Sequence, residues 1–149
     1  MKIFNRNYPH LALGLLLLRI GLGLTFMAHG LPKLAGGPAG WENLGGAMAN
    51  WGITFAPVFW GFAGAVAEFG GGLLLLLGLF FRPVCLVLVL TMATATLVHF
   101  KNGDDFSTLS HSLEMGIVFL SLFFTGPGKH SLDYRLGRDP KPTMRPLSH

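Results

Sequence analysis

The sequence predicts an all-α, polytopic membrane protein built as a bundle of four transmembrane helices. Of its 149 residues, 51% are hydrophobic and only 12% are charged, whereas soluble domains carry roughly 25% charged residues. Long apolar runs recur four times, each near the ~20 residues that a helix needs to cross the hydrocarbon core of a bilayer. We predict spans at about 11–30, 55–80, 83–100 and 109–125.

The first span contains a charge, Arg19. An uncompensated charge in a membrane costs on the order of 2.5–3.5 kcal/mol on insertion scales. The apolar run is too long for the core of a signal peptide, and Phe26 lies two residues before Ala28, where a cleavage site needs a small side chain. We therefore expect a retained helix whose arginine has a partner inside the protein.

The later spans also carry polar side chains. The second contains Glu68, followed by a glycine run at 70–72 that would let another backbone or a flat ligand approach closely. The third ends at His99, and the fourth begins with His111 and Glu114. Helix breakers separate the spans: Pro32 with Gly36-Gly37-Pro38, then Arg82-Pro83, then 102–105, then Gly126-Pro127-Gly128.

The connection between the first two spans is longer than a turn, and we expect a longer extracytoplasmic loop there. It holds Trp41, Trp51 and Trp60, and tryptophan favours the headgroup region of a membrane. Residues 41–51 would form either a short helix along the interface, which two central glycines weaken, or an irregular loop with aromatic anchors.

Basic residues predict the orientation. Four spans put both termini on one side, together with these residues: Lys2, Arg6, Arg82, Lys129, Arg135, Arg138, Lys141 and Arg145. The other side has Lys33 and Lys101. The positive-inside rule therefore places both termini in the cytoplasm and explains the basic residues without nucleic acid as a partner. We expect one domain at 1–135 and a flexible cytoplasmic tail at 136–149.

Depth along the helices suggests which charges meet. At a rise of ~1.5 Å per residue, Arg19 lies roughly 15 Å deeper than His29, where the first span is expected to end. Glu68 lies at a similar depth in the second span. We predict that Arg19 and Glu68 form a buried ion pair near the midplane. A purely structural pair that fixes helix register is the alternative.

The other polar residues gather at the outer end. His111 and Glu114 are three residues apart and share a helix face, and His29 and His99 end their spans on the same side. Each histidine alone would be read as an interfacial residue near a helix end. Together they predict a polar track with these candidate site residues: Arg19, His29, Glu68, His99, His111 and Glu114.

Metal binding and thiol chemistry are disfavoured. His99, His111 and Glu114 are residue types that bind iron, copper or zinc, but their one His-x-x-Glu pair reverses the order found in di-iron bundles. We therefore predict no metal site. Cys85 is the only cysteine, which excludes an internal disulfide, a CxxC pair and a zinc-cysteine site.

Five pieces of sequence, in order over about residues 11–135, carry a family resemblance. They are Arg19 in the first span, the run at 26–33, the run at 68–72 followed by 78–82, His99 with Glu114, and the run at 126–133. In this order and at this spacing, the chain resembles DoxX-like (DoxX/DoxD-like) integral membrane proteins. The resemblance implies a four-helix membrane fold and a role in membrane redox systems. Some members are linked to thiosulfate oxidation with electron transfer to quinone, and others to complexes with superoxide dismutase and a sulfurtransferase in thiol stress.

We therefore expect a membrane-embedded subunit of a quinone-linked or thiol/sulfur-linked oxidoreductase system in a bacterial cytoplasmic (inner) membrane. Its cofactor would be quinone, and its partners would be the lipid bilayer, a soluble or membrane redox protein and, in a homo-oligomer, further copies of itself. Arg19 would stabilise developing negative charge, and the histidines would pass protons. A non-catalytic membrane anchor or assembly protein and a small-solute or metal transporter are the alternatives, and whether the chain is itself an enzyme is left open.

Overall fold

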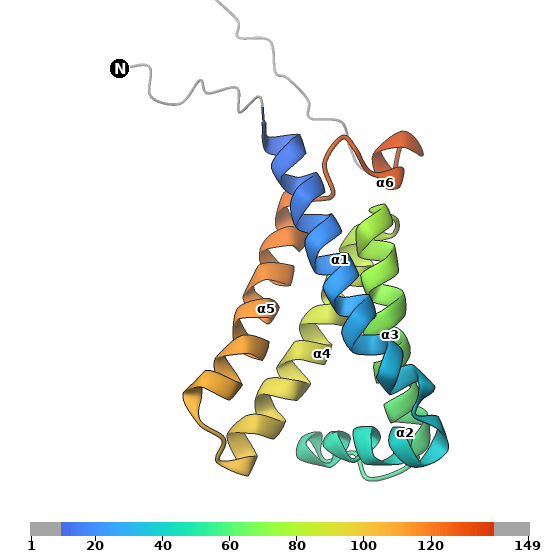
Figure 1. Cartoon of the computed structure of the whole chain (residues 1–149), viewed down its shortest axis with the longest axis vertical. Coiled ribbons are helices and arrows are strands. Elements are labelled where there is room, and N and C mark those ends of the chain that lie inside the picture. Colours follow the sequence, from blue (N-terminus) through green and yellow to red (C-terminus); the bar gives the residue numbers. More distant parts are fainter. Residues whose placement is uncertain (1–9, 139–149) are drawn as a thin grey trace, which may run out of the picture.

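The computed structural model describes residues 10–138. Within this part the chain is helical, with no β-strand: α1 (Leu11–Ala35), α2 (Gly37–Gly45), the 3-10 helix η1 (Gly46–Trp51), α3 (Pro57–Leu77), α4 (Phe81–Asn102), α5 (Phe106–Thr125) and α6 (Leu132–Arg135). The helices α1, α3, α4 and α5 are long and apolar enough to cross a membrane. This confirms the predicted all-α, four-helix membrane fold (Figure 1). Most of the predicted tail at 136–149 lies outside the described residues.

Helices α1 and α3 run antiparallel and approach closely at glycines. A methyl group on Gly23 would lie 2.8 Å from the carbonyl oxygen of Gly72, and one on Gly30 would overlap the backbone of Phe69. Small residues at such contacts let membrane helices pack backbone to backbone. The two contacts fix the register of the pair. Helix α1 continues past Pro32 to Ala35. Because of these contacts, its last turns lie beside α3.

The connection between α1 and α3 contains two short helices, as in the short-helix alternative predicted for residues 41–51, and the longer loop is not confirmed. Helices α2 and η1 lie across one end of the bundle, which we call the α2 end, opposite the α6 end (Figure 1). Helices α2 and α3 meet at Gly45 of α2 and Gly61 of α3. A methyl group on either glycine would overlap the backbone of the other helix. Trp41 stabilises this contact further: its indole donates to the Lys33 carbonyl at 3.1 Å, and its ring packs edge-on against Phe62.

The hydrophobic core fills the half of the bundle nearer the α6 end. Its buried members come from all four long helices: Phe26, Leu75, Phe81, Val84, Cys85, Leu88, Met92, Phe119 and Leu122. Phe26 of α1 and Phe119 of α5 meet edge to face, with ring centroids 4.8 Å apart. The half nearer the α2 end is packed less completely and contains the cavity described below.

Candidate functional site

The guanidinium of Arg19 lies at the α6 end and is almost completely buried, at 1% exposure. Its Nε donates to the carbonyl of Leu75 at 3.1 Å, Nη2 to that of Leu76 at 2.8 Å, and Nη1 to that of Pro127 at 3.0 Å. Leu75 and Leu76 belong to the last turn of α3, where carbonyls carry partial negative charge; the Leu75 carbonyl also accepts from the N–H of Gly78 at 3.1 Å. Arg19 therefore caps α3 and ties it to the loop that follows α5.

The predicted ion pair between Arg19 and Glu68 is corrected by the structure. The Glu68 carboxylate accepts instead from the Lys33 ammonium, at 2.6 and 2.7 Å. Glu68 precedes Leu75 by seven residues, about 10 Å along α3, so Arg19 lies at a different level. The error came from ending the first span near residue 30. The antiparallel register places Gly30, not Arg19, beside Phe69, and the extension to Ala35 brings Lys33 to the carboxylate.

Lys33 and Glu68 line a cavity of about 720 Å³ at the α2 end. Its walls come from α3 and α4, and α2 and η1 lie across it. Most of the lining is small or apolar, including Ala63, Ala67 and Val98, and isolated polar side chains interrupt it: Asn43, Asn50, Thr91, Thr94 and His99. Small-molecule sites are typically of about 300–1,000 Å³, with apolar walls and a few placed polar groups. The cavity has both properties.

Trp60 lies in the wall of this cavity and contains an unpaired hydrogen-bond donor. It belongs to the lining, and its indole nitrogen is buried without a hydrogen-bond partner anywhere in residues 10–138. Leaving a buried donor unpaired costs about 1–3 kcal/mol. The indole of Trp41 shows the usual arrangement, because its N–H is bonded to the Lys33 carbonyl. The nitrogen has almost no accessible surface, so other atoms of Trp60 line the cavity and the N–H does not face it.

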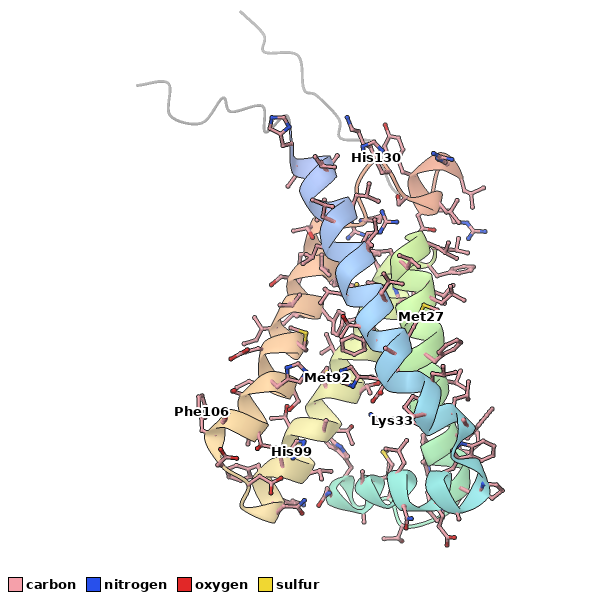
Figure 2. The ribbon with its side chains drawn as sticks, in the orientation of Figure 1. Met27, Lys33, Met92, His99, Phe106 and His130 are labelled. Atoms are coloured by element: carbon pink, nitrogen blue, oxygen red, sulfur yellow. The ribbon has the colours of Figure 1, made fainter. Side chains whose placement is uncertain are left out.

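The cavity includes two of the predicted site residues, Glu68 and His99. Figure 2 shows Lys33 and His99 in the half of the molecule nearer the α2 end, with His130 at the opposite end. The Nδ1 atom of His99 lies 2.6 Å from Oδ2 of Asp104 in the turn between α4 and α5.

Asp105 ends the same turn. The hydroxyl of Thr108, in the first turn of α5, donates a hydrogen bond to the Asp105 carboxylate and lowers the pKa of that carboxyl below its ordinary value.

The remaining predicted residues are not brought together with the cavity. His29 on α1, and His111 and Glu114 on α5, are exposed on the outside of the bundle, and Arg19 is at the α6 end. The expected continuous polar track is therefore interrupted. His99, His111 and Glu114 do not form a metal-binding group, since no cluster of three His, Cys, Asp or Glu side chains occurs in the described part of the chain.

Sequence reasoning missed Lys33 and Trp60 as site residues. Lys33 was treated as a loop charge, and Trp60 was treated as an interfacial aromatic of the connecting segment. A signal for Lys33 was available, because a carboxylate within a span needs a cation from a neighbouring helix. Lys33 precedes a glycine-proline break by only three residues, so extending the first helix to that break would have made it the partner for Glu68.

Comparison with known proteins agrees with this architecture. Residues 14–101 match the DoxX family, which covers α1 through nearly all of α4 and every cavity residue. The chain is 33% identical over 128 residues to inner membrane protein YqjF of Escherichia coli (strain K12), covering 84% of this chain and 93% of that protein. It is 30% identical over 129 residues to inner membrane protein YphA of the same organism, covering 81% and 89%. No solved structure matches the chain. The protein belongs to the DoxX family.

Proposed function

We propose that this protein is a quinone-interacting subunit of an oxidoreductase system in the bacterial inner membrane, with both termini in the cytoplasm. We place the quinone headgroup in the cavity at the α2 end. The observation that carries the proposal is the Lys33–Glu68 ion pair set in the wall of a largely apolar, ligand-sized cavity. The chemical class comes from the DoxX resemblance, and the location from the two inner membrane relatives.

The shape and lining of the cavity suit an amphipathic ring with an apolar tail. Ala63, Gly64 and Ala67 present a flat, small-residue wall on α3. Val87 and Leu90 of α4 belong to the lining and are also exposed on the outer surface, at 45% and 66%. The cavity is therefore open sideways, toward the acyl chains of a surrounding bilayer, and a long tail would leave in that direction.

The polar groups suit the headgroup. When bound, a quinone supplies the capacity to accept two electrons and two protons, and the electrons would come from the redox partner of the system. Lys33 would donate a hydrogen bond to a carbonyl oxygen and, as a fixed cation, would stabilise negative charge that develops there. Lys33 thus takes the role first expected of Arg19.

Two further residues would hold Lys33 and move protons. Glu68 accepts from the ammonium through both oxygens and so keeps Lys33 at the cavity wall. His99 lines the cavity, and its side chain is 34% exposed. Histidine serves as a proton shuttle in many proteins, so His99 would carry protons between the cavity and the water at the α2 end, with Asp104 orienting its ring.

The test is quinone retention by the purified protein, measured by solvent extraction, together with the absorbance change on chemical reduction. We expect bound quinone in the natural chain and at least a tenfold loss of affinity in Lys33→Met. Lys129→Met, an exposed lysine at the α6 end, is the matched control and should retain quinone. A purified protein with no quinone and no quinone-dependent spectral change would exclude the proposal, as would Lys33→Met binding like the natural chain.

A non-catalytic anchor or assembly role is the second candidate, and the bonding of Arg19 favours it. That residue, the most conspicuous charge in the spans, bonds to backbone carbonyls and stabilises the fold. Under this alternative, cavity variants that fold normally would keep full activity in cells, and only fold-disrupting variants would lose it. A thiol-exchange role has less support, because Cys85 is fully buried in the core.

A further inference from the structure

The outward face of α5 carries ionisable side chains at a depth where lipid would lie. Glu114 is eight residues after Phe106, about 12 Å along the helix, and eleven residues before its other end. Glu114 and His111 are exposed, and neither makes a hydrogen bond or ion pair within residues 10–138. Ionisable residues in membrane spans normally face protein or a water-filled cavity, because exposure to acyl chains is costly. A protein surface is therefore expected to cover this face.

The polar residues of this face follow a heptad spacing. Positions 107, 111, 114, 118, 121 and 125 are separated alternately by four and three residues, the pattern by which two helices pack along a seam. We call these positions the α5 stripe: Ser107, His111, Glu114, Val118, Ser121 and Thr125. All except Val118 are polar and exposed, and Val118 is half-buried. The adjoining face of α5 carries the buried residues Ser112, Phe119 and Leu122, and Val118 packs against the core at the border between the two faces.

We propose that the α5 stripe is the interface of a parallel homodimer. Copies of one membrane protein share the same orientation in the bilayer, so a two-fold axis runs along the membrane normal and pairs the two α5 helices in parallel. Such an interface must be self-complementary. The stripe meets this condition because His111 is a donor and Glu114 an acceptor one turn away. Each Glu114 would accept from a histidine of the other copy, and the serine and threonine hydroxyls would bond along the rest of the seam.

The dimer would leave the candidate quinone cavity unchanged. That cavity is bounded by α3 and α4 with α2 and η1, and no residue of the α5 stripe contributes to it. The dimer proposal therefore stands or falls independently of the proposed function.

Cysteine cross-linking in membranes tests the seam directly. Cys85 is fully buried, so the natural chain provides the background without cross-links. We expect Val118→Cys and Ser121→Cys to give disulfide-linked dimers under mild oxidation. Leu113→Cys and Leu120→Cys are matched controls, because both positions are exposed, at 43% and 44%, at neighbouring depths but on the other flank of α5. Cross-linking at the controls equal to that at the stripe would overturn the proposal, as would no cross-linking at the stripe.

A second measurement uses the mass of the detergent-solubilised protein. The natural chain should be a dimer by light scattering. Glu114→Leu, which suits a lipid-facing surface, should weaken dimerisation at least tenfold, and Glu114→Gln, which keeps hydrogen-bonding capacity, should weaken it less. A monomeric natural chain that also fails to cross-link would show that the stripe faces a different protein or lipid. Unchanged dimerisation in Glu114→Leu would place the interface elsewhere.

Discussion

Lys33 and Glu68 form the ion pair that joins α1 to α3 at the α2 end, with Nζ 2.6 Å from Oε1 and 2.7 Å from Oε2. Their side chains differ in exposure, at 39% for Lys33 and 8% for Glu68. The pair therefore neutralises a carboxylate held inside a membrane span and leaves a cation accessible at the cavity wall. Stability and ligand binding both depend on it, and each dependence can be measured separately.

The ion pair predicts a rescue by double substitution. Lys33→Met should lower the free energy of unfolding by about 2 kcal/mol, below the 3–5 kcal/mol of a fully buried pair because Lys33 is partly exposed. Adding Glu68→Met should restore most of that loss, since no buried charge is then left unpaired. Thermal unfolding in one detergent compares the natural chain with both variants. A double variant no more stable than Lys33→Met would contradict the pairing.

The position of Arg19 predicts that no such rescue occurs with Glu68. Arg19→Leu removes the donor to the carbonyls of Leu76 and Pro127, while the Leu75 carbonyl keeps its bond from the Gly78 N–H, and should cost about 3 kcal/mol. Combining it with Glu68→Leu should give the sum of the single effects within about 0.5 kcal/mol, because the two sites are independent. Arg19→Lys should recover only part of the loss, because an ammonium lacks the planar fork of a guanidinium. Mutual rescue would restore the original ion-pair hypothesis.

Asp133 predicts a local effect at the start of α4. Its two oxygens accept from the backbone N–H of Phe80 at 3.1 Å and of Phe81 at 2.8 Å. A carboxylate at a helix N-terminus is stabilising, so Asp133→Asn should cost about 1–2 kcal/mol and speed hydrogen exchange at these two amides. Asp104→Asn, in the exposed turn after α4, is the control and should leave them unchanged. Equal exchange in both variants would show that Asp133 is not the cap.

The packing of α2 predicts opposite outcomes for two kinds of glycine. Gly61→Ala forces a methyl group into the facing backbone and should cost about 1–3 kcal/mol through overpacking. It should also weaken quinone retention, because α2 forms one side of the cavity. Gly40→Ala, within α2, meets nothing within 4 Å and should be neutral or stabilise by up to about 1 kcal/mol through helix propensity. Thermal unfolding and quinone extraction on the same samples would separate the two effects, and equal behaviour would be inconsistent with the packing.

The site was only partly predictable. Glu68 and His99 were identified because polar side chains in apolar spans are unusual wherever those spans pack. Lys33 and Trp60 were missed because a lysine and a tryptophan near span ends have ordinary roles in membrane topology. Glu114 and His111 were assigned to an interior track, yet they face outward, because the spacing of residues along a helix shows which of them share a face but not what that face contacts.

The sequence by itself determined the four apolar helices and the need for charge compensation, because hydrophobic length and polar composition act locally along the chain. Two predicted breaks were wrong, since α1 continues through Pro32 and Arg82-Pro83 lies in the first turn of α4. Only the tertiary structure decided which cation neutralises Glu68 and which backbone carbonyls accept hydrogen bonds from Arg19. Those pairings depend on the register of two antiparallel helices, and that register is set by backbone contacts of Gly23 with Gly72 and of Gly30 with Phe69. Residues that meet in this way are far apart in the chain, so a shift of one or two helical turns, invisible in the hydropathy pattern, exchanges one partner for another.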